Sequence, residues 1–293
     1  MSSNMEDSVQ KLETKNLVIA AIARNIGSSF SRDLERIESA FADFKQITWI
    51  VVESDSSDDS VEILRRIAIE RPSFNLVELG KLDNGISSRT ERLALARNCY
   101  LDFIEMNRID LDFLAVVDLN SLNFLIDLHG IRSCFIRDDW DVVTANQSGP
   151  YYDIWALRHE LWSPNDCWLQ HEFLRKYMHN PEKALLVAVN SRMLRIPKNS
   201  SWIEVDSSFG GLAIYKKDSF NGSRYKGKTE SGVDICEHVT FHAQLRHQGK
   251  RIFINPSLIN AKFTDHSRRS TLIYSLLRRA DYPRKFLSRF FNK

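Results

Sequence analysis

The chain has 293 residues, of which 40 are lysine or arginine and 38 are aspartate or glutamate, so its formal net charge is +2. This near-balance excludes a globally basic nucleic-acid-binding protein and a strongly acidic, solvating chain. Hydrophobic residues make up 43% of the chain, enough for a sizeable core, and no apolar run approaches the ~20 residues that a membrane-spanning helix needs.

The first half alternates short apolar runs with segments of helical periodicity. Strands are predicted at 16–23, 47–52, 74–79 and 113–118, and helices at 30–44, at 61–68 and from the capping box at 88–91 to about 106. Strands separated by amphipathic helices need crossover connections. The first half therefore predicts an α/β fold with a mostly parallel sheet.

The second half is less regular. Five of the six tryptophans lie between Trp140 and Trp202, where periodicity is poor and we expect long loops and short helices. Regular patterns return as a strand, a Gly-Gly turn and a strand over 202–217, a helix over 233–248 and a short strand over 251–255.

The two ends of the chain differ from the rest in composition. Residues 1–15 are polar and serine-rich, lack the pattern of a signal peptide, and are expected to be disordered. The segment 268–293 carries eight basic residues against Asp281, interleaved with leucine and phenylalanine. It is either a solvated terminal helix or a tail that contacts an anionic membrane; no RNA-binding motif accompanies it.

The cysteines indicate the compartment. No CxxC pair occurs among Cys99, Cys134, Cys167 and Cys236, which argues against a disulfide framework and a structural zinc site. We expect a cytoplasmic protein, peripheral at the inner face of a membrane if the basic tail binds lipid.

Polar side chains follow three of the predicted strands. Arg24 follows the first strand, Glu53 and Asp55 the second, and Asp118 and Asn120 the fourth. Ligands of open parallel sheets bind beyond the carboxyl ends of the strands, although such residues also serve as helix caps and turns. The chain has neither a P-loop nor a GxGxxG fingerprint, so side chains and a metal would have to hold a nucleotide.

Six segments in order resemble GT-A-fold glycosyltransferases that use a nucleotide-sugar donor. They are VIAAIARN (18–25), VVESDSSDDS (51–60), ERLALARNCYL (91–101), FLAVVDLNSL (113–122), VDSSFGGLAIYKK (205–217) and CEHVTFHAQLRHQGKRIFINPSL (236–258). The likeness is nearest to bacterial polysaccharide glycosyltransferases and fungal capsule-associated mannosyltransferases. It implies one GT-A (Rossmann-like) domain over 16–267, with a central mostly parallel sheet flanked by helices.

The resemblance also implies a donor site and a metal. The residues implied to bind the nucleotide sugar are Ala23, Arg24, Glu53, Asp55, Arg97, Asn98 and Asp118. The metal-binding DxD position reads Asp118-Leu119-Asn120, and His266 stands where some of these enzymes place a further ligand. Mn²⁺ or Mg²⁺ is the implied cofactor, but Asn120 brings no charge, which weakens the metal site.

Catalysis and acceptor binding fall on the second half. If the reaction inverts, Glu237 is expected to be the base that takes the acceptor proton, with Asp234, one turn earlier, as its rival; a retaining enzyme would not need Glu237 as base, and either acid could instead be a first-turn helix acid. His238 and His242 form HVTFH and lack the glutamate of a zinc peptidase. The residues expected at the acceptor are Tyr152, Asp153, Trp155, Arg158, Gly210 and Gly211.

The sequence thus predicts a hexosyltransferase that moves a sugar from a nucleotide diphosphate to a glycan or lipid-linked acceptor in surface polysaccharide synthesis, such as a capsule. The alternative is a catalytically degenerate scaffold subunit of a glycan-assembly complex. A nucleotidyltransferase fits less well, because the chain lacks a Gly-rich opening loop.

Overall fold

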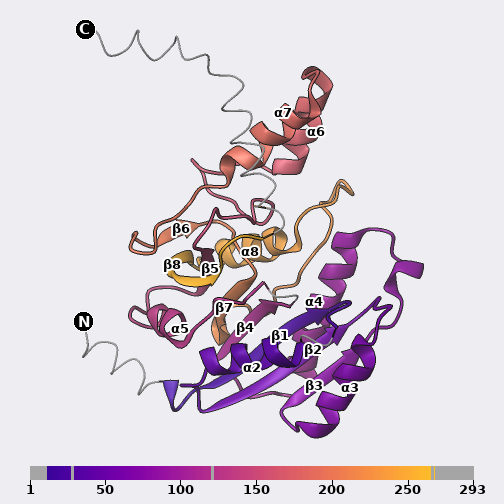
Figure 1. Ribbon diagram of the computed structural model, residues 1–293, viewed down its shortest axis with the longest axis vertical. Helices are drawn as coiled ribbons and strands as arrows, with labels where there is room; N and C mark the ends of the chain where they lie inside the picture. The colour runs from indigo at the N-terminus through magenta and orange to yellow at the C-terminus, as the bar shows by residue number, and fades with distance from the viewer. Residues whose placement is uncertain (1–11, 28–29, 120–121, 265–266, 268–293) are drawn as a thin grey trace.

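A computed structural model describes residues 12–27, 30–119, 122–264 and 267. Eight strands form one sheet there, in the order β3-β2-β1-β4-β7-β5-β8-β6 (Figure 1). The strands are β1 (Asn16–Ala23), β2 (Gln46–Glu53), β3 (Phe74–Glu78), β4 (Phe113–Asp118), β5 (Val142–Gln147), β6 (Ile203–Val205), β7 (Leu212–Lys216) and β8 (Ile252–Ala261).

Most of these strands run in the same direction. β3, β2, β1 and β4 are parallel neighbours, and β5 is parallel to β8. β7 is antiparallel to both β4 and β5, and β6 is antiparallel to β8. The predicted α/β fold with a mostly parallel sheet is confirmed.

Helices cover both faces of the sheet. The α-helices are α2 (Phe30–Ala40), α3 (Ser60–Glu70), α4 (Arg89–Met106), α5 (Leu128–Cys134), α6 (Cys167–Tyr177), α7 (Pro181–Ala188) and α8 (Glu237–His247), and the 3₁₀ turns are η1 (Leu82–Asn84), η2 (Asn190–Arg192) and η3 (Lys217–Ser219). One core cluster joins α4 and α8 to the sheet through Tyr100 and Phe241, and the other joins α2, α3 and α5 through Phe30, Leu64 and Ile131. Coverage on both faces explains why the first strands are almost continuously apolar.

Two strands differ from the sequence prediction. β5 lies in the region expected to be loops, yet all six of its residues are buried between β7 and β8. Its apolar pattern is interrupted by Thr144, Asn146 and Gln147, whose side chains bond inside the core. β8 continues past the predicted end at 255, because irregular pairing with β5 absorbs Pro256.

The segments near the ends are described only in part. Residues 12–15, from the segment expected to be disordered, include the buried Leu12, and Lys15 pairs with Asp112 at 2.9 Å. The rest of that segment and the basic tail 268–293 lie outside the described residues. No helix in the described ranges combines the length and apolarity needed to cross a membrane.

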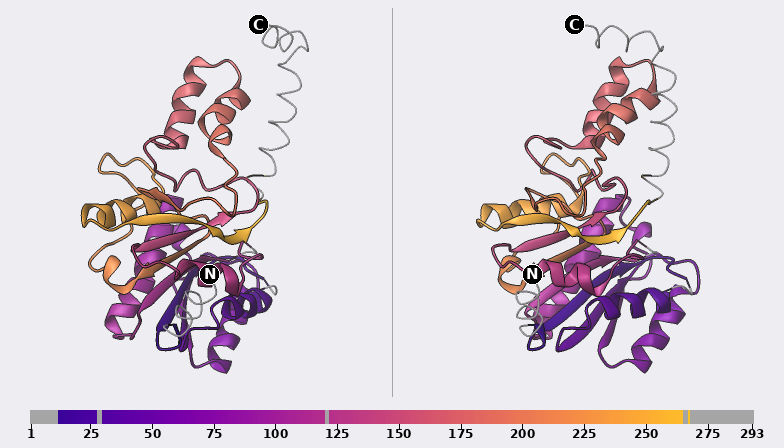
Figure 2. Two further views of the ribbon diagram at one scale, coloured as in Figure 1. Left: turned by 90° about the vertical axis from the view of Figure 1, so that its left-hand side faces the viewer. Right: turned by 60° about the vertical axis from the view of Figure 1, so that its left-hand side comes forward.

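A helical hairpin made of α6 and α7 extends away from the sheet and its covering helices (Figures 1 and 2). Asp166 caps α6 by accepting hydrogen bonds from the backbone of Trp168 and Leu169, and Asn180 caps α7 in the same way. Pro181 stands at the start of α7, where its missing N–H costs nothing. The expectation of short helices in this region is confirmed.

Candidate active site

The parallel strands bring the predicted donor residues to one edge of the sheet. Ile22 of β1 is in register with Asp118 of β4, and Ala23 is in register with Glu53 of β2. Since neighbouring strands lie ~4.8 Å apart, the backbones of Glu53 and Asp118 are about 10 Å apart. That span suits a nucleotide lying across the strand ends.

Arg97 of α4 is the centre of a buried charge cluster at this edge. Its Nε donates to Glu237 Oε1 at 2.8 Å and its Nη2 to Asp118 Oδ1 at 3.4 Å. The side chain is only 3% exposed, and the guanidinium lies over the ring of Phe209. Nη1 is buried and has no hydrogen-bond partner among the described residues. An anionic ligand is the natural partner for that third nitrogen.

Glu237 opens α8 and is almost completely buried beside Arg97. The ring of the next residue, His238, stacks on Phe209 with centroids 3.8 Å apart. Burial lowers the pKa of His238 well below its ordinary value, so the ring is neutral and its 3.7 Å contact with Glu237 is not an ion pair. The charge of Glu237 is therefore balanced by Arg97.

His242 has a structural role. Its Nδ1 bonds Ser207 Oγ at 2.9 Å and its Nε2 bonds the hydroxyl of Tyr215 at 2.8 Å. Both ring nitrogens are used, and burial lowers the pKa of His242 to about 3. The HVTFH pair belongs to the core packing of α8.

The Gly210-Gly211 turn holds two acidic residues next to each other. Gly210 N donates to Asp153 Oδ2 at 3.0 Å, and Asp118 N donates to Gly211 O at 2.9 Å. Both glycines have a positive φ, and a Cβ on Gly210 would lie 2.9 Å from the carbonyl oxygen of Ala145. A larger residue here would displace the backbone that sets the spacing of Asp118 and Asp153.

The two carboxylates are only partly buried and differ from ordinary surface acids. Burial raises the pKa of Asp153 to about 6, helped by the negative charges of Asp118 and Glu237 and opposed by the Gly210 N–H. Burial also raises the pKa of Asp118, against the positive charges of Arg97 and Arg89. Acids with raised pKa values beside arginines are typical of catalytic clefts.

Arg89 was not predicted. It is the exposed first residue of α4, and its charge acts on Asp118. The sequence showed it only as part of a capping box, in which Ser88 accepts from Glu91 N. Its position at a helix start, facing the end of β4, was the signal that could have identified it.

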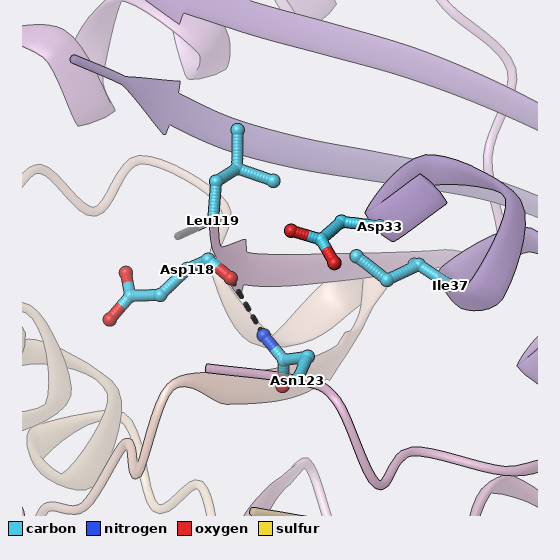
Figure 3. A pocket seen from close by; sticks show the side chains of 5 residues that line it. All are labelled: Asp33, Ile37, Asp118, Leu119 and Asn123. Carbon is cyan, nitrogen blue, oxygen red and sulfur yellow. Dashed lines mark hydrogen bonds between the residues drawn. The ribbon is translucent and has the colours of Figure 1, made fainter. Parts of the chain in front are cut away.

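A network of buried amides braces the site from the other side. Asn123 Nδ2 donates to the backbone oxygens of Asp118 and Gly211, at 2.7 and 3.1 Å, and Asn260 Nδ2 donates to Asn123 Oδ1 and Gly210 O. Asn123 lines a small hollow together with Asp33, Ile37, Asp118 and Leu119 (Figure 3). The carboxylate of Asp118 points away from Asp33 in this view, so the two acids do not form a site there.

The residues predicted to contact the nucleoside bond to other parts of the protein. Glu53 Oε1 accepts from Ser56 N at 3.0 Å, and Asp55 accepts from Asp83 N at 3.0 Å and pairs with Arg92 at 3.5 Å. Arg24 is exposed, whereas Ala23 is buried. Glu53 and Asp55 thus shape the loop at the edge.

Several predicted residues have other partners. Asp234 is exposed and accepts a hydrogen bond from Ser88 at the start of α4, about 13 Å along the helix from Arg97. Both ends of the Asn98 amide bond the backbone of Tyr225. The structure therefore does not bring Asp234 to Arg97.

On the acceptor side, the structure brings Asp153, Gly210 and Gly211 to Asp118. Tyr152 lies close by, since its hydroxyl would be 3.0 Å from a Cβ on Gly211. Trp155 Nε1 and Arg158 Nη2 instead donate to Asp166 Oδ2, at 3.0 and 2.8 Å. These two side chains fasten the base of the hairpin.

The predicted metal site is described only at Asp118. Asn120 and His266 lie outside the described residues. Over the described ranges, no group of three or more histidine, cysteine, aspartate or glutamate side chains is arranged to hold a metal ion. Asp118 also faces the positive charges of Arg97 and Arg89, which would compete with a cation for its carboxylate.

No family model and no curated protein matches the sequence. Solved structures that it is similar to include a mannosyltransferase from Pyrobaculum calidifontis with GDP-Man and Mn²⁺ (12% identity, 96% of this chain and 74% of that one, TM-score 0.47). Residues 1–349 of Staphylococcus aureus TarS match with 11% identity over 92% and 67% of the chains, TM-score 0.49. Glucosyl-3-phosphoglycerate synthase from Mycobacterium tuberculosis, with Mn²⁺, UDP and phosphoglyceric acid, matches with 12% identity over 95% and 83%, TM-score 0.41. At these identities and TM-scores, function has to be argued from this chain's own residues.

Proposed function

We propose that this protein is a glycosyltransferase that moves a hexose from a nucleotide diphosphate to a hydroxyl of a glycan or lipid-linked acceptor. The observation that carries the proposal is the buried Arg97, which is held between Asp118 and Glu237 and keeps one guanidinium nitrogen without a protein partner. An enclosed arginine with a spare donor at the carboxyl edge of a parallel sheet suits a diphosphate.

Two arginines give the donor a binding mode without a glycine-rich loop. Arg97 Nη1 would bind one phosphate, and the exposed Arg89 would close on the diphosphate from the start of α4. The N-terminus of α4 also adds positive electrostatic potential at the diphosphate, because the helix dipole has its positive end there. The nucleoside would extend about 10 Å across the strand ends towards Glu53 and Asp55.

Asp153 is the better placed base. Glu237 is buried, and its Oε1 is occupied by Arg97, which favours a positioning role over the catalytic role expected from the sequence. Asp153 is partly exposed beside Asp118, and its pKa of about 6 lets it be both ionised and basic at neutral pH. Its carboxylate would accept the acceptor proton as the oxygen attacks the anomeric carbon, while the nucleotide diphosphate leaves with the electron pair of the broken C–O bond. This step inverts the anomeric configuration.

A divalent cation is the second proposed source of positive charge at the diphosphate. Asp118 would supply one carboxylate, but the described residues do not complete a ligand set. The positive charges of Arg97 and Arg89 would balance the charge of the leaving diphosphate.

The test is turnover and binding across UDP-, GDP- and TDP-sugars, with and without Mn²⁺. Asp153→Asn should lower transfer by roughly 10²–10⁴-fold while keeping the thermal shift caused by the nucleotide. Asp59→Asn, at an exposed aspartate before α3, is the matched control and should transfer like the wild type. Absence of both turnover and a nucleotide-induced shift across all donors would refute the proposal and favour the scaffold alternative.

The cellular setting is the finer part of the proposal. The acceptor would belong to a surface polysaccharide such as a capsule, built at the cytoplasmic face of a membrane. The charge of the tail 268–293 supports contact with anionic lipid. Transfer to lipid-linked glycans presented on vesicles, compared with the free glycans, would test this setting.

A further inference from the structure

Arg97 is surrounded by aromatic rings as well as by its two carboxylates. Its guanidinium carbon lies 5.1 Å from the ring centroid of Phe209 and 5.9 Å from that of Tyr225. The Phe209 ring is inclined by 20° to the ring of His238, and the Tyr225 ring is inclined by 86° to it. The two rings beside the guanidinium are therefore steeply inclined to each other, and they face it from two directions.

These rings stabilise the charge of Arg97 without taking up its hydrogen-bond donors. The face of an aromatic ring attracts a cation, and phenylalanine has no acceptor oxygen. The hydroxyl of Tyr225 forms its hydrogen bond with the hydroxyl of Tyr100, 3.0 Å away. Arg97 Nη1 keeps no hydrogen-bond partner among the described residues, although the side chain is buried. It remains the donor that the proposed function assigns to a phosphate.

Tyr225 is fixed in place at its backbone and at its ring. The side-chain amide of Asn98 donates to Tyr225 O at 3.0 Å and accepts from Tyr225 N at 2.8 Å. The Tyr225 ring, which is buried, stacks on Phe241 of α8 with centroids 4.0 Å apart. Asn98 and Arg97 are neighbours on α4, so the helix that carries the guanidinium also holds the ring that packs against it.

The segment that contains Tyr225 runs along α4 and contacts it on both sides of this residue. Arg224 Nη2 pairs with Glu105 Oε2 at 2.7 Å, near the end of the helix. A Cβ on Gly227 would lie 2.2 Å from the carbonyl carbon of Thr90, in the first turn of the helix. A larger residue than glycine would displace one of the two backbones. These contacts set the position of Tyr225 against α4.

We propose that Tyr225 is a positioning residue for the donor diphosphate, whose ring holds the Arg97 guanidinium so that Nη1 stays available to a phosphate. This inference rests on the proposed function, since it takes the ligand of Nη1 to be a nucleotide diphosphate. Asn98, which the sequence implied as a direct donor contact, would act through Tyr225 instead. Loss of the ring should therefore weaken binding of the diphosphate and leave binding of the nucleoside, about 10 Å away across the strand ends, unchanged.

The experiment is calorimetric titration of the full chain with UDP, GDP and TDP and with the matching nucleosides. Tyr225→Leu should bind the preferred diphosphate about tenfold more weakly than the wild type, and its nucleoside within about twofold. Tyr225→Phe keeps the ring and should stay within about threefold of the wild type for the diphosphate. The control is Phe44→Leu, at a buried aromatic residue of the other core cluster. It should lower stability comparably and bind both ligands like the wild type.

A second pair of variants tests the route through Asn98. Asn98→Ala should also weaken diphosphate binding, because it releases the backbone of Tyr225. Combined with Tyr225→Leu it should add little, since both changes act through the same ring. Additive losses would overturn this route and assign Asn98 to direct contact with the donor.

Two outcomes would overturn the role of Tyr225. One is a Tyr225→Leu variant that binds the diphosphate as tightly as the wild type. The other is a loss that Phe44→Leu shares or that extends equally to the nucleoside, because lower stability would then explain it. A wild type that binds none of the diphosphates would instead refute the proposed function, and this inference with it, before any variant is compared.

Discussion

The two sides of the Arg97 cluster differ in burial and in pairing. On the inner side, Glu237 is buried against Arg97 Nε and next to a neutral histidine. On the outer side, Asp153 is partly exposed, accepts hydrogen bonds from the backbone N–H groups of Gly210 and Ala156, and has its pKa raised to about 6. The inner acid is thus held by a buried arginine, whereas the outer acid is held by two backbone amides and keeps part of its surface exposed. A carboxylate near a donor site is a base only if a substrate hydroxyl can reach it.

The largest effect is expected from removing Arg97. Arg97→Met leaves the buried Glu237 without its counter-ion, which should destabilise the fold by about 3–5 kcal/mol and abolish donor binding. Chemical denaturation measures the loss. The control is Arg65→Met, which breaks the exposed pair with Glu78 and should change stability little. Equal losses in both variants would contradict a special role for the inner pair.

The next largest effect distinguishes the roles of Glu237 and Asp153, and it is expected from Glu237→Gln. The amide oxygen can still accept the hydrogen bond from Arg97, so we expect kcat/KM to fall only roughly tenfold. The decline of kcat/KM at low pH, which we assign to protonation of Asp153, should remain. Asp153→Asn, in contrast, should remove that decline. If Glu237→Gln abolishes transfer and Asp153→Asn does not, the two roles are the reverse of those proposed.

The pH profile tests the outer acid directly. The base must be ionised, so kcat/KM of the wild type should rise about tenfold per pH unit below 6 and level off above it. The contribution of Asp153 to the free energy of unfolding should change in the opposite direction. Because the folded-state pKa of Asp153 is raised from 3.8 to about 6, the unfolded chain binds fewer protons between these values, and this group's contribution to stability falls as pH rises from 4 to 6. Rate assays and denaturation over the same pH range check both signs.

The smallest effect is expected at Arg89. This exposed side chain acts on Asp118 through solvent, so Arg89→Ala should raise the donor KM only several-fold, and added salt should reduce the difference. Arg66→Ala, at an exposed arginine of α3, should leave KM unchanged. A donor KM for Arg89→Ala that matches the wild type at low salt would exclude Arg89 from the diphosphate site.

The sequence predicted the first half of the fold well because its strands are buried on both faces and therefore read as unbroken apolar runs. It missed β5, where Thr144, Asn146 and Gln147 are buried through side-chain hydrogen bonds that only the folded chain provides. The sequence did not identify Asn123 and Asn260 for the same reason, because their amides find partners at the glycine turn only in the folded chain. Contacts over long sequence distances, such as Arg97 with Glu237, cannot be read from spacing, although the helix start and the strand end that carry them were recognised.

Asp166 has a mechanical consequence. Its carboxylate begins α6 and at the same time accepts from Trp155 and Arg158, close in sequence to Asp153. The projecting hairpin and the loop that follows Asp153 are therefore anchored at one point. Removing the Asp166 carboxylate would uncouple the two, because its hydrogen bonds to Trp155 and Arg158 are the link.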